Sequence, residues 1–349
     1  MSDSSAGKPP RRERYTGKNP RRFDQKYKEQ QPERYVEDIE KILASGKTPA
    51  GSHRPIMVEE ILAVLKPLAG ETAVDCTLGH GGHASHLLRA VQPGGKLIAF
   101  DTDPVELPKT EARLRASGCD PAALIVVRSN FIGLAHSLAI HAACGVDVLL
   151  ADLGLSSMQI DDPKRGFSYK HDGPLDMRMN PLKGLSASEW IARISETDLA
   201  QSLTENADEP QAEPLARAIL QAQSRAALTT TQSLVAVVRR SMSNNSEATA
   251  SATVQRVFQA IRIAVNDEFG ALDAHLRQLP SCMKPGGRIA ILSFHSGEDR
   301  RVKTAFKLGL AGGLFSSISE DVMRTSYAEQ HANPRSASAK LRWAIVSRP

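Results

Sequence analysis

The sequence predicts an α/β fold built on a mostly parallel sheet, and two observations carry this prediction. From residue 72 to residue 152, short apolar runs of strand length alternate with segments of helical periodicity, which is typical of parallel strands joined by crossover helices. The first run ends in Asp75 and breaks into a glycine-rich turn before a helical pattern resumes at Ala84. Ligands of such folds bind at the carboxyl ends of the strands, so we expect the functional site at that edge.

The composition is that of a large globular chain. With 349 residues, 41% of them hydrophobic, the chain can bury the core of one large domain or two ordinary ones. No apolar run reaches the length of a membrane span, and no apolar signal core stands near the N-terminus. The cysteines are scattered without a C-x-x-C pair, which argues against a disulfide framework or a zinc knuckle. We therefore expect a soluble, cytoplasmic protein. The cysteines are Cys76, Cys119, Cys144 and Cys282.

The elements of the first half follow from periodicity and from the residues that interrupt it. Apolar residues at helical spacing between Pro55 and Leu65 predict an amphipathic helix. After the glycine turn, Leu87, Leu88 and Val91 continue a second helix. Alternation then continues to residue 152. It predicts strands at 97–100, 124–127 and 146–152, a helix at 104–117, and a helix after the turn 129–131 that runs through Ile140.

The second half begins with helical patterns. Ser186-x-x-Glu189 forms a capping-box sequence ahead of apolar residues at helical spacing. An apolar stripe from Val254 to Leu276 predicts a long helix that contributes to the core. The remaining patterns predict helices at 37–44, 214–223 and 231–242 and strands at 286–293 and 341–346.

Two acids at strand ends distinguish between cofactor classes. The spacing Gly79-x-Gly81-x-x-Ala84 also fits a degenerate dinucleotide fingerprint. A carboxylate at Asp75 would repel a pyrophosphate on the following helix but would attract the ammonium group of S-adenosylmethionine. Asp101 ends the next strand, where a carboxylate can accept hydrogen bonds from ribose hydroxyls. The pair favours a methyltransferase over a nicotinamide enzyme, and over a plain glycine turn with two chance acids.

Three histidines recur at every third residue and raise the question of a metal site. They are His80, His83 and His86. Neither an acidic nor a cysteine cluster accompanies them in the sequence, and the first two fall in the turn. We therefore predict no metal centre here and expect structural or cofactor contacts.

The chain resembles a known family through several uncommon motifs in a fixed order. Residues 53–349 are similar to the bacterial ribosomal RNA small-subunit methyltransferase H family, also called MraW-like. This family methylates N4 of a cytidine in the decoding region of 16S rRNA with S-adenosylmethionine. The motifs are Gly79-His-Gly-Gly-His83, Asp101-Thr-Asp-Pro104, Asp152-Leu-Gly-Leu-Ser-Ser-Met-Gln159, Asp172-Gly-Pro-Leu-Asp-Met-Arg-Met179, Phe258-Gln-Ala-Ile-Arg-Ile263, Ser293-Phe-His-Ser296 and Asn333-Pro-Arg335.

The resemblance implies the class I S-adenosylmethionine-dependent methyltransferase fold, a Rossmann-like seven-stranded sheet with an inserted all-helical domain. The domains expected are a basic N-terminal extension at 1–50, a catalytic core at 51–162 and 246–349, and a helical substrate-recognition insert at 163–245. The extension is expected to be an addition to the family pattern. Two segments, 206–209 and 252–256, also depart from the family's usual sequence. Arg256 and Arg262, beside the apolar stripe, are expected to face RNA.

The site residues come from both lines of reasoning. Asp75 and Gly79 follow from the strand–turn–helix pattern, and the resemblance places the remaining cofactor contacts at Gly81, Gly82, His83, Asp101, Phe131, Asp152 and Gln159. Methylation of an amine needs aligned hydrogen-bond acceptors. The candidates are Asp152, Ser156, Ser293 and His295, although His295 has an alternative role as a helix cap.

The function expected is therefore N4-methylation of a small-subunit rRNA cytidine, with S-adenosylmethionine as cofactor. The expected partner is small-subunit rRNA or the 30S subunit, with no membrane; a homodimer is left open. Two alternatives remain: a methyltransferase-fold RNA-binding factor with altered or lost activity, and a methyltransferase acting on another RNA.

The N-terminal segment holds the whole net charge. Residues 1–35 contain ten Lys or Arg and five Asp or Glu, which equals the +5 of the entire chain. This composition predicts disorder, and arginines interleaved with aromatic residues can grip phosphates and stack on bases. A role in solubility alone is the alternative.

Deleting residues 1–35 should flatten the dependence of RNA affinity on salt, because fewer counterions are then released on binding. Binding to an RNA hairpin can be measured from low to moderate salt for both proteins. An identical slope for the full chain and the deletion would leave the segment as a solubility device.

Overall fold

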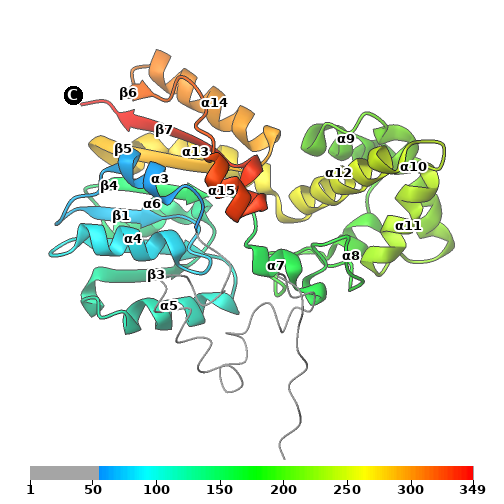
Figure 1. The fold of residues 1–349 in the computed structure, drawn as a ribbon, viewed down its shortest axis with the longest axis horizontal. Coiled ribbons are helices and arrows are strands. Elements are labelled where there is room, and N and C mark those ends of the chain that lie inside the picture. Colours follow the sequence, from blue (N-terminus) through cyan, green and yellow to red (C-terminus); the bar gives the residue numbers. More distant parts are fainter. Residues whose placement is uncertain (1–54, 349) are drawn as a thin grey trace, which may run out of the picture. The chain divides into compact units, whose positions relative to one another are not determined.

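The computed structural model describes residues 55–348. At its centre, seven strands form one sheet in the order β3-β2-β1-β4-β5-β7-β6 (Figure 1). Strands β1 to β5 are parallel, whereas β7 is antiparallel to both β5 and β6. This topology confirms the predicted α/β class and the seven-stranded class I methyltransferase fold. The strands are β1 Thr72–Asp75, β2 Lys96–Asp101, β3 Leu124–Arg128, β4 Val146–Asp152, β5 Met283–Ser293, β6 Phe315–Ile318 and β7 Lys340–Val346.

Helices cover both faces of the sheet because successive side chains of each buried strand point to opposite sides. Ala73 and Leu97 pack toward one helical layer, and their neighbours Val74 and Ile98 pack toward the other. The first layer consists of α3 Val58–Leu65, α4 Gly82–Val91 and α5 Glu106–Ala116. The second consists of α6 Leu134–His141, α13 Glu268–Cys282 and α14 Ser296–Ala311.

A separate apolar core joins the helices between β4 and β5. It extends from Phe167 to Ile261 and has no buried member from the sheet. The capping box predicted at Ser186 is present: its hydroxyl accepts from the N–H of Glu189, whose carboxylate accepts from the N–H of Ser186. The helices of this cluster are α8 Ala187–Ile191, α9 Glu196–Ala207, α10 Ala212–Arg225, α11 Thr231–Ser241 and α12 Glu247–Asn266. The domain limits at 163 and 245 remain a prediction.

The stripe predicted as one helix is two helices. Its members are buried as expected, but α12 ends at Asn266 and α13 begins at Glu268. Between them Asp267 is in the left-handed region, with φ 48°. A side chain at position 270 would meet the Asp267 carboxylate within 2.4 Å, so Gly270 leaves room for this break. Apolar periodicity continues across the break and therefore did not reveal it.

Other elements had no clear signal in the sequence. They include β6, the short helix α7 at Ser157–Asp161 and α15 at Tyr327–Ala332. The predicted helix at 37–44 and the basic segment lie outside the described residues. Within residues 55–348, no helix combines the length and apolar character needed to span a bilayer.

Two arginines expected to face RNA are held by acids inside the protein. Arg256 Nε donates to Glu209 Oε2 at 2.7 Å, and the Glu209 side chain is completely buried. Arg262 forms a two-pronged pair with Glu268, at 2.8 Å for both contacts. Both side chains stay partly exposed, at 29% and 18%, so contact of Arg256 or Arg262 with RNA stays a prediction. Glu209 lies in the segment 206–209 and Arg256 in the segment 252–256, the two that depart from the family pattern. Their ion pair therefore connects these two segments.

Replacing Arg256 with Met should lower the free energy of unfolding by on the order of 3 kcal/mol, because a buried carboxylate then loses its partner. Chemical denaturation measures the change. Adding Glu209→Gln should restore part of the loss by removing the buried charge. The matched control is Arg217→Met, whose pair with Glu196 is largely exposed and should contribute under about 1 kcal/mol. Equal losses in the two single variants would contradict the buried-pair interpretation.

Candidate active site

The glycine turn between β1 and α4 is fixed by two hydrogen bonds and by close packing. Gly79 N–H donates to Asp101 Oδ2 at 2.7 Å, and its carbonyl accepts from Thr110 Oγ1 at 2.7 Å. Gly81 has φ 73°, and a side chain there would meet Thr110 Cγ2 at 2.9 Å. At Gly82 a Cβ would lie 3.0 Å from Pro55. The turn thus packs closely against Thr110 and Pro55, and a side chain at Gly81 or Gly82 would force these neighbours to shift.

Asp101 connects the end of β2 with this turn. One carboxylate oxygen accepts from Gly79 N–H and the other from Asp103 N–H at 2.9 Å. Burial raises the pKa of Asp101, while these backbone bonds oppose the rise. Each oxygen keeps lone pairs for a further donor. The geometry is therefore compatible with the predicted acceptance of ribose hydroxyls.

Asp103, two residues further on, holds the segment that follows β4. Its Oδ2 accepts from Gln159 Nε2 at 3.0 Å and from Arg165 Nη1 at 2.9 Å. Burial acts to raise the pKa of Asp103, but the bonds from Arg165 and from Val105 N–H lower it overall. Arg165 Nη2 also donates to the carbonyl of Met179. Sequence reasoning missed this network, because its members are up to 76 residues apart and no local pattern links them.

Three ionisable side chains meet at the ends of β1 and β4. Asp75 is 1% exposed, and Thr77 N–H donates to its carboxylate at 3.0 Å. Burial raises the pKa of Asp75 to about 6; the Thr77 bond and His83 act against the rise, and Asp152 adds to it. His83 Nε2 lies 3.5 Å from Asp152 Oδ2. Three of the predicted cofactor contacts, Asp75, His83 and Asp152, therefore lie in one cluster.

This cluster contains buried polar atoms without a hydrogen-bond partner. Within the described part of the chain, neither His83 Nε2 nor Asp152 Oδ1 has one. Buried polar groups are nearly always hydrogen-bonded, so these two atoms are open to a bound polar group.

Phe131 begins a 3-10 turn, Phe131–Gly133, after β3. The Asn130 side chain caps this turn by accepting from Ile132 N–H. On α13, Gln278 Nε2 donates to the carbonyls of Phe131 and Ile132 at 3.1 and 3.2 Å. The ring of Phe131 lies 4.9 Å from that of His275. Neither α13 residue was predicted, since both lie far from Phe131 in sequence.

Ser156 and Gln159 form a capping box at the start of α7. Ser156 Oγ accepts from Gln159 N–H, and Gln159 Oε1 accepts from Ser156 N–H. Because Gln159 Nε2 bonds to Asp103, both ends of its amide are engaged within the protein. Ser293 is 2% exposed, and its hydroxyl donates to the Lys340 carbonyl. The serine hydroxyls therefore have structural contacts.

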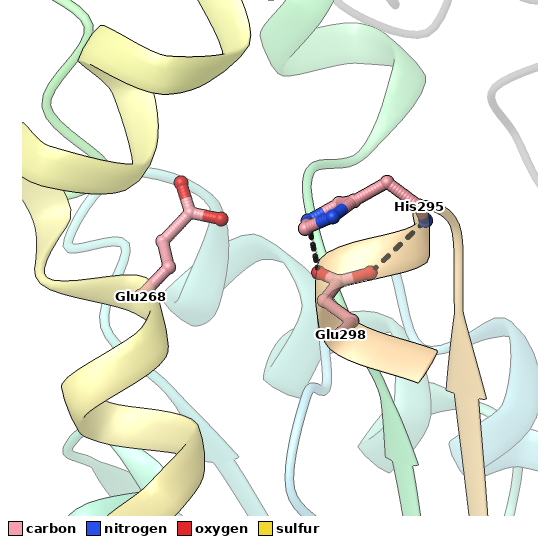
Figure 2. A group of neighbouring side chains, drawn as sticks. All are labelled: Glu268, His295 and Glu298. Atoms are coloured by element: carbon pink, nitrogen blue, oxygen red, sulfur yellow. Dashed lines mark hydrogen bonds and ion pairs between the residues drawn. The ribbon is translucent and has the colours of Figure 1, made fainter. Parts of the chain in front are cut away.

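His295 precedes α14 and lies in a charged cluster (Figure 2). Its Nε2 is 3.2 Å from Glu298 Oε1, and Glu298 Oε2 accepts from Phe294 N–H at 2.8 Å. Burial acts to raise the pKa of Glu298, but His295 and the backbone bond lower it overall. The ligand atoms of Glu268, His295 and Glu298 lie within 4.8 Å of one another, as a metal site would require. Both oxygens of Glu268 already accept from Arg262, so we describe this cluster as an ion-pair network.

Comparison with known proteins identifies the family. A model described as the MraW methylase family matches residues 50–346. The chain belongs to this family. Ribosomal RNA small subunit methyltransferase H 1 of Lachnoclostridium phytofermentans is 46% identical, over 96% of this chain and 92% of that protein. The H 2 protein of Alkaliphilus metalliredigens is 43% identical, over 98% and 99%.

The comparisons also correct the expectation that residues 1–50 are an addition to the family. Matches covering 96% and 98% of this chain leave too few residues to omit that segment. The methyltransferase H of Acidobacterium capsulatum is 38% identical and covers 83% of this chain but 97% of its own length. Members of this MraW family therefore differ in length, and long members match most of the segment.

Replacing Gly81 with Ala should destabilise the protein more than replacing Gly118 with Ala. Both positions have a positive φ, near 73° and 82°, which costs roughly 1–2 kcal/mol for a residue with a side chain. Only Gly81 adds a steric conflict, with Thr110, whereas nothing lies within 4 Å of a Cβ at Gly118. Urea denaturation of both variants measures the difference; equal midpoints would show that the turn adjusts freely.

Proposed function

We propose that this chain transfers the methyl group of S-adenosylmethionine to the exocyclic N4 of a cytidine in the decoding region of small-subunit rRNA. Membership in the MraW methylase family and the names of the relatives support rRNA methylation. The N4 position and the decoding region come from the motif resemblance. The observation that carries the proposal is the row of carboxylates, Asp75, Asp101 and Asp152, at the carboxyl ends of adjacent parallel strands.

The residues present fit S-adenosylmethionine. Asp75 offers a buried negative charge for the ammonium group, and Asp101 offers acceptors for the ribose. The orphan atoms of His83 and Asp152 match a polar ligand. When bound, the cofactor supplies an electrophilic methyl group. The proposed contacts are Asp75, Gly79, Gly81, Gly82, His83, Asp101, Phe131, Asp152 and Gln159.

Among the four predicted catalytic residues, the geometry favours Asp152. The N4 lone pair is delocalised into the pyrimidine ring, so the enzyme must align the amine and accept its protons. Asp152 Oδ1 has no partner in the described chain, and the side chain is 29% exposed. Leu153, directly after Asp152, donates its N–H to the Leu292 carbonyl, so the end of β5 lies beside the end of β4. We infer that Asp152 accepts the hydrogen bond of the amine.

The other candidates are less suited to that role. The hydroxyls of Ser156 and Ser293 take part in a helix cap and a strand contact. His295 is held by Glu298 and packs against the Phe269 ring at 5.6 Å. We propose that His295 shapes the site where the base arrives and does not itself take the proton.

The main alternative is an RNA-binding factor of the same fold without activity, or a methyltransferase for another RNA. The segments 206–209 and 252–256 made this alternative conceivable, because they depart from the family pattern. The Glu209–Arg256 ion pair gives one residue of each segment a structural role. Mass spectrometry of rRNA nucleosides from a deletion strain distinguishes the possibilities. Loss of one N4-methylated cytidine from cytoplasmic small-subunit rRNA supports the proposal, and unchanged rRNA refutes it.

The affinity for S-adenosylmethionine should rise as the pH increases from 5 to 7. Binding an ammonium group favours ionised Asp75, and a pKa of about 6 leaves this carboxyl mostly protonated at pH 5. The affinity at pH 5 should therefore be roughly tenfold weaker than above pH 7. Calorimetry measures it, and Asp75→Asn should bind more weakly with a nearly flat profile. Parallel profiles for both proteins would assign the pH effect to the neighbours His83, Asp101 or Asp152.

A variant with all four cysteines changed to serine should still methylate, and the product should be N4-methylcytidine. Methylation of the ring carbon C5 ordinarily needs a cysteine thiolate that adds to the base. Here Cys76 and Cys282 are buried, and Cys144 precedes β4, at the opposite edge from Asp152. Circular dichroism verifies folding, and nuclease digestion with mass spectrometry identifies the product. Detection of 5-methylcytidine, or an inactive but folded variant, would overturn the assignment.

A further inference from the structure

A completely buried histidine lies behind the Phe131 turn. His275, on α13, is 0% exposed. Its ring centroid is 4.9 Å from that of Phe131, with the planes inclined by 56°. Its Nε2 lies 3.9 Å from Cys76 Sγ. His275 therefore touches two segments from different strand ends, although neither the motifs nor the proposed chemistry includes it.

The protonation of this group follows from its surroundings. Burial lowers the pKa of His275 to about 4, and the Phe131 backbone opposes the change. Burial also raises the pKa of Cys76 well above its ordinary value, with a smaller effect from Asp75. A neutral imidazole faces a protonated thiol, so the S–H can donate to Nε2 while Nδ1 carries the ring proton. Nδ1 itself has no hydrogen-bond partner among the described residues.

The two linked segments are those proposed to hold opposite ends of the cofactor. Cys76 follows Asp75, the proposed partner of the ammonium group, and the family resemblance places the Phe131 ring against the adenine, as a wall of its site. Gln278 lies three residues after His275, on the same helical face, and fixes the same turn through the carbonyls of Phe131 and Ile132. Helix α13 thus sets how far the Phe131 turn lies from the end of β1.

We propose that His275 is a positioning residue for S-adenosylmethionine, holding the Phe131 ring and the end of β1 in the register that the cofactor requires. The inference rests on the proposed function and adds a residue outside the contact set. A buried polar ring costs free energy unless its hydrogen bonds are made. If packing alone were needed, a phenylalanine of similar shape would serve as well.

The first test compares His275→Phe, which keeps a ring but loses the contact of Nε2 with the Cys76 thiol, with His275→Gln, whose amide oxygen can lie close to the position of Nε2 and accept from that thiol. Calorimetry with S-adenosylmethionine should show a Kd about tenfold higher for His275→Phe, with partial recovery in His275→Gln. The KM for the cofactor should rise in parallel, while kcat and the KM for RNA stay near wild type. The matched control is His136→Phe on α6, an exposed histidine, which should change none of these values.

Each outcome decides the matter. A folded His275→Phe protein that binds the cofactor within twofold of wild type overturns the positioning role, as does a kcat loss without a change in KM. If His275→Phe does not fold, Cys76→Ala removes the thiol donor with a smaller change of volume. A several-fold rise in cofactor Kd is then expected, and an unchanged Kd overturns the inference. Failure of the wild-type chain to bind S-adenosylmethionine would refute the proposed function itself, and this inference with it.

Discussion

Carboxylates buried at the ends of parallel strands set the geometry of the whole site. Asp101 accepts two backbone N–H groups and so holds the glycine turn against the end of β2. Asp75 and Asp152 end the neighbouring strands β1 and β4, and their charges act on each other. Parallel strands bring these ends to one edge, where Asp75 is buried while Asp152 stays 29% exposed. The pKa of Asp75 is raised chiefly because this carboxyl is buried, and the nearby charges of Asp152 and Asp101 add to the rise.

The helical cluster is connected to this edge through α12 and α13. The left-handed residue Asp267 separates the two helices, and Glu268 at the start of α13 pairs with Arg262 near the end of α12. From there α13 extends to Gln278, which fixes the turn of Phe131. One stretch of chain therefore contacts both the helical cluster and the proposed adenine wall. This gives a direct mechanical link between the part expected to meet RNA and the part expected to hold the cofactor.

The sequence predicted best what local periodicity controls. Strands β1 to β4 and the capping box at Ser186 were located because alternation, turn residues and caps are local signals. The break at Asp267 was missed because apolar spacing continues across it. The ion pair of Arg256 was not predicted because its partner Glu209 is 47 residues away in sequence. The glycine turn and its acids could be identified together, whereas Asp103 with Arg165, and His275 with Cys76, meet only through tertiary folding.

The position of β7 has a consequence for biosynthesis. This strand comes last along the chain, yet it lies inside the sheet between β5 and β6. Within residues 55–348, β6 pairs with no strand besides β7, and β5 keeps an open edge until residues 340–346 have left the ribosome. The parallel half of the sheet can assemble during translation, but closure over β5 must follow the synthesis of the C-terminal strand. An enzyme proposed to act on ribosomal RNA would thus close its sheet only after residues 340–346 have been synthesised on a ribosome.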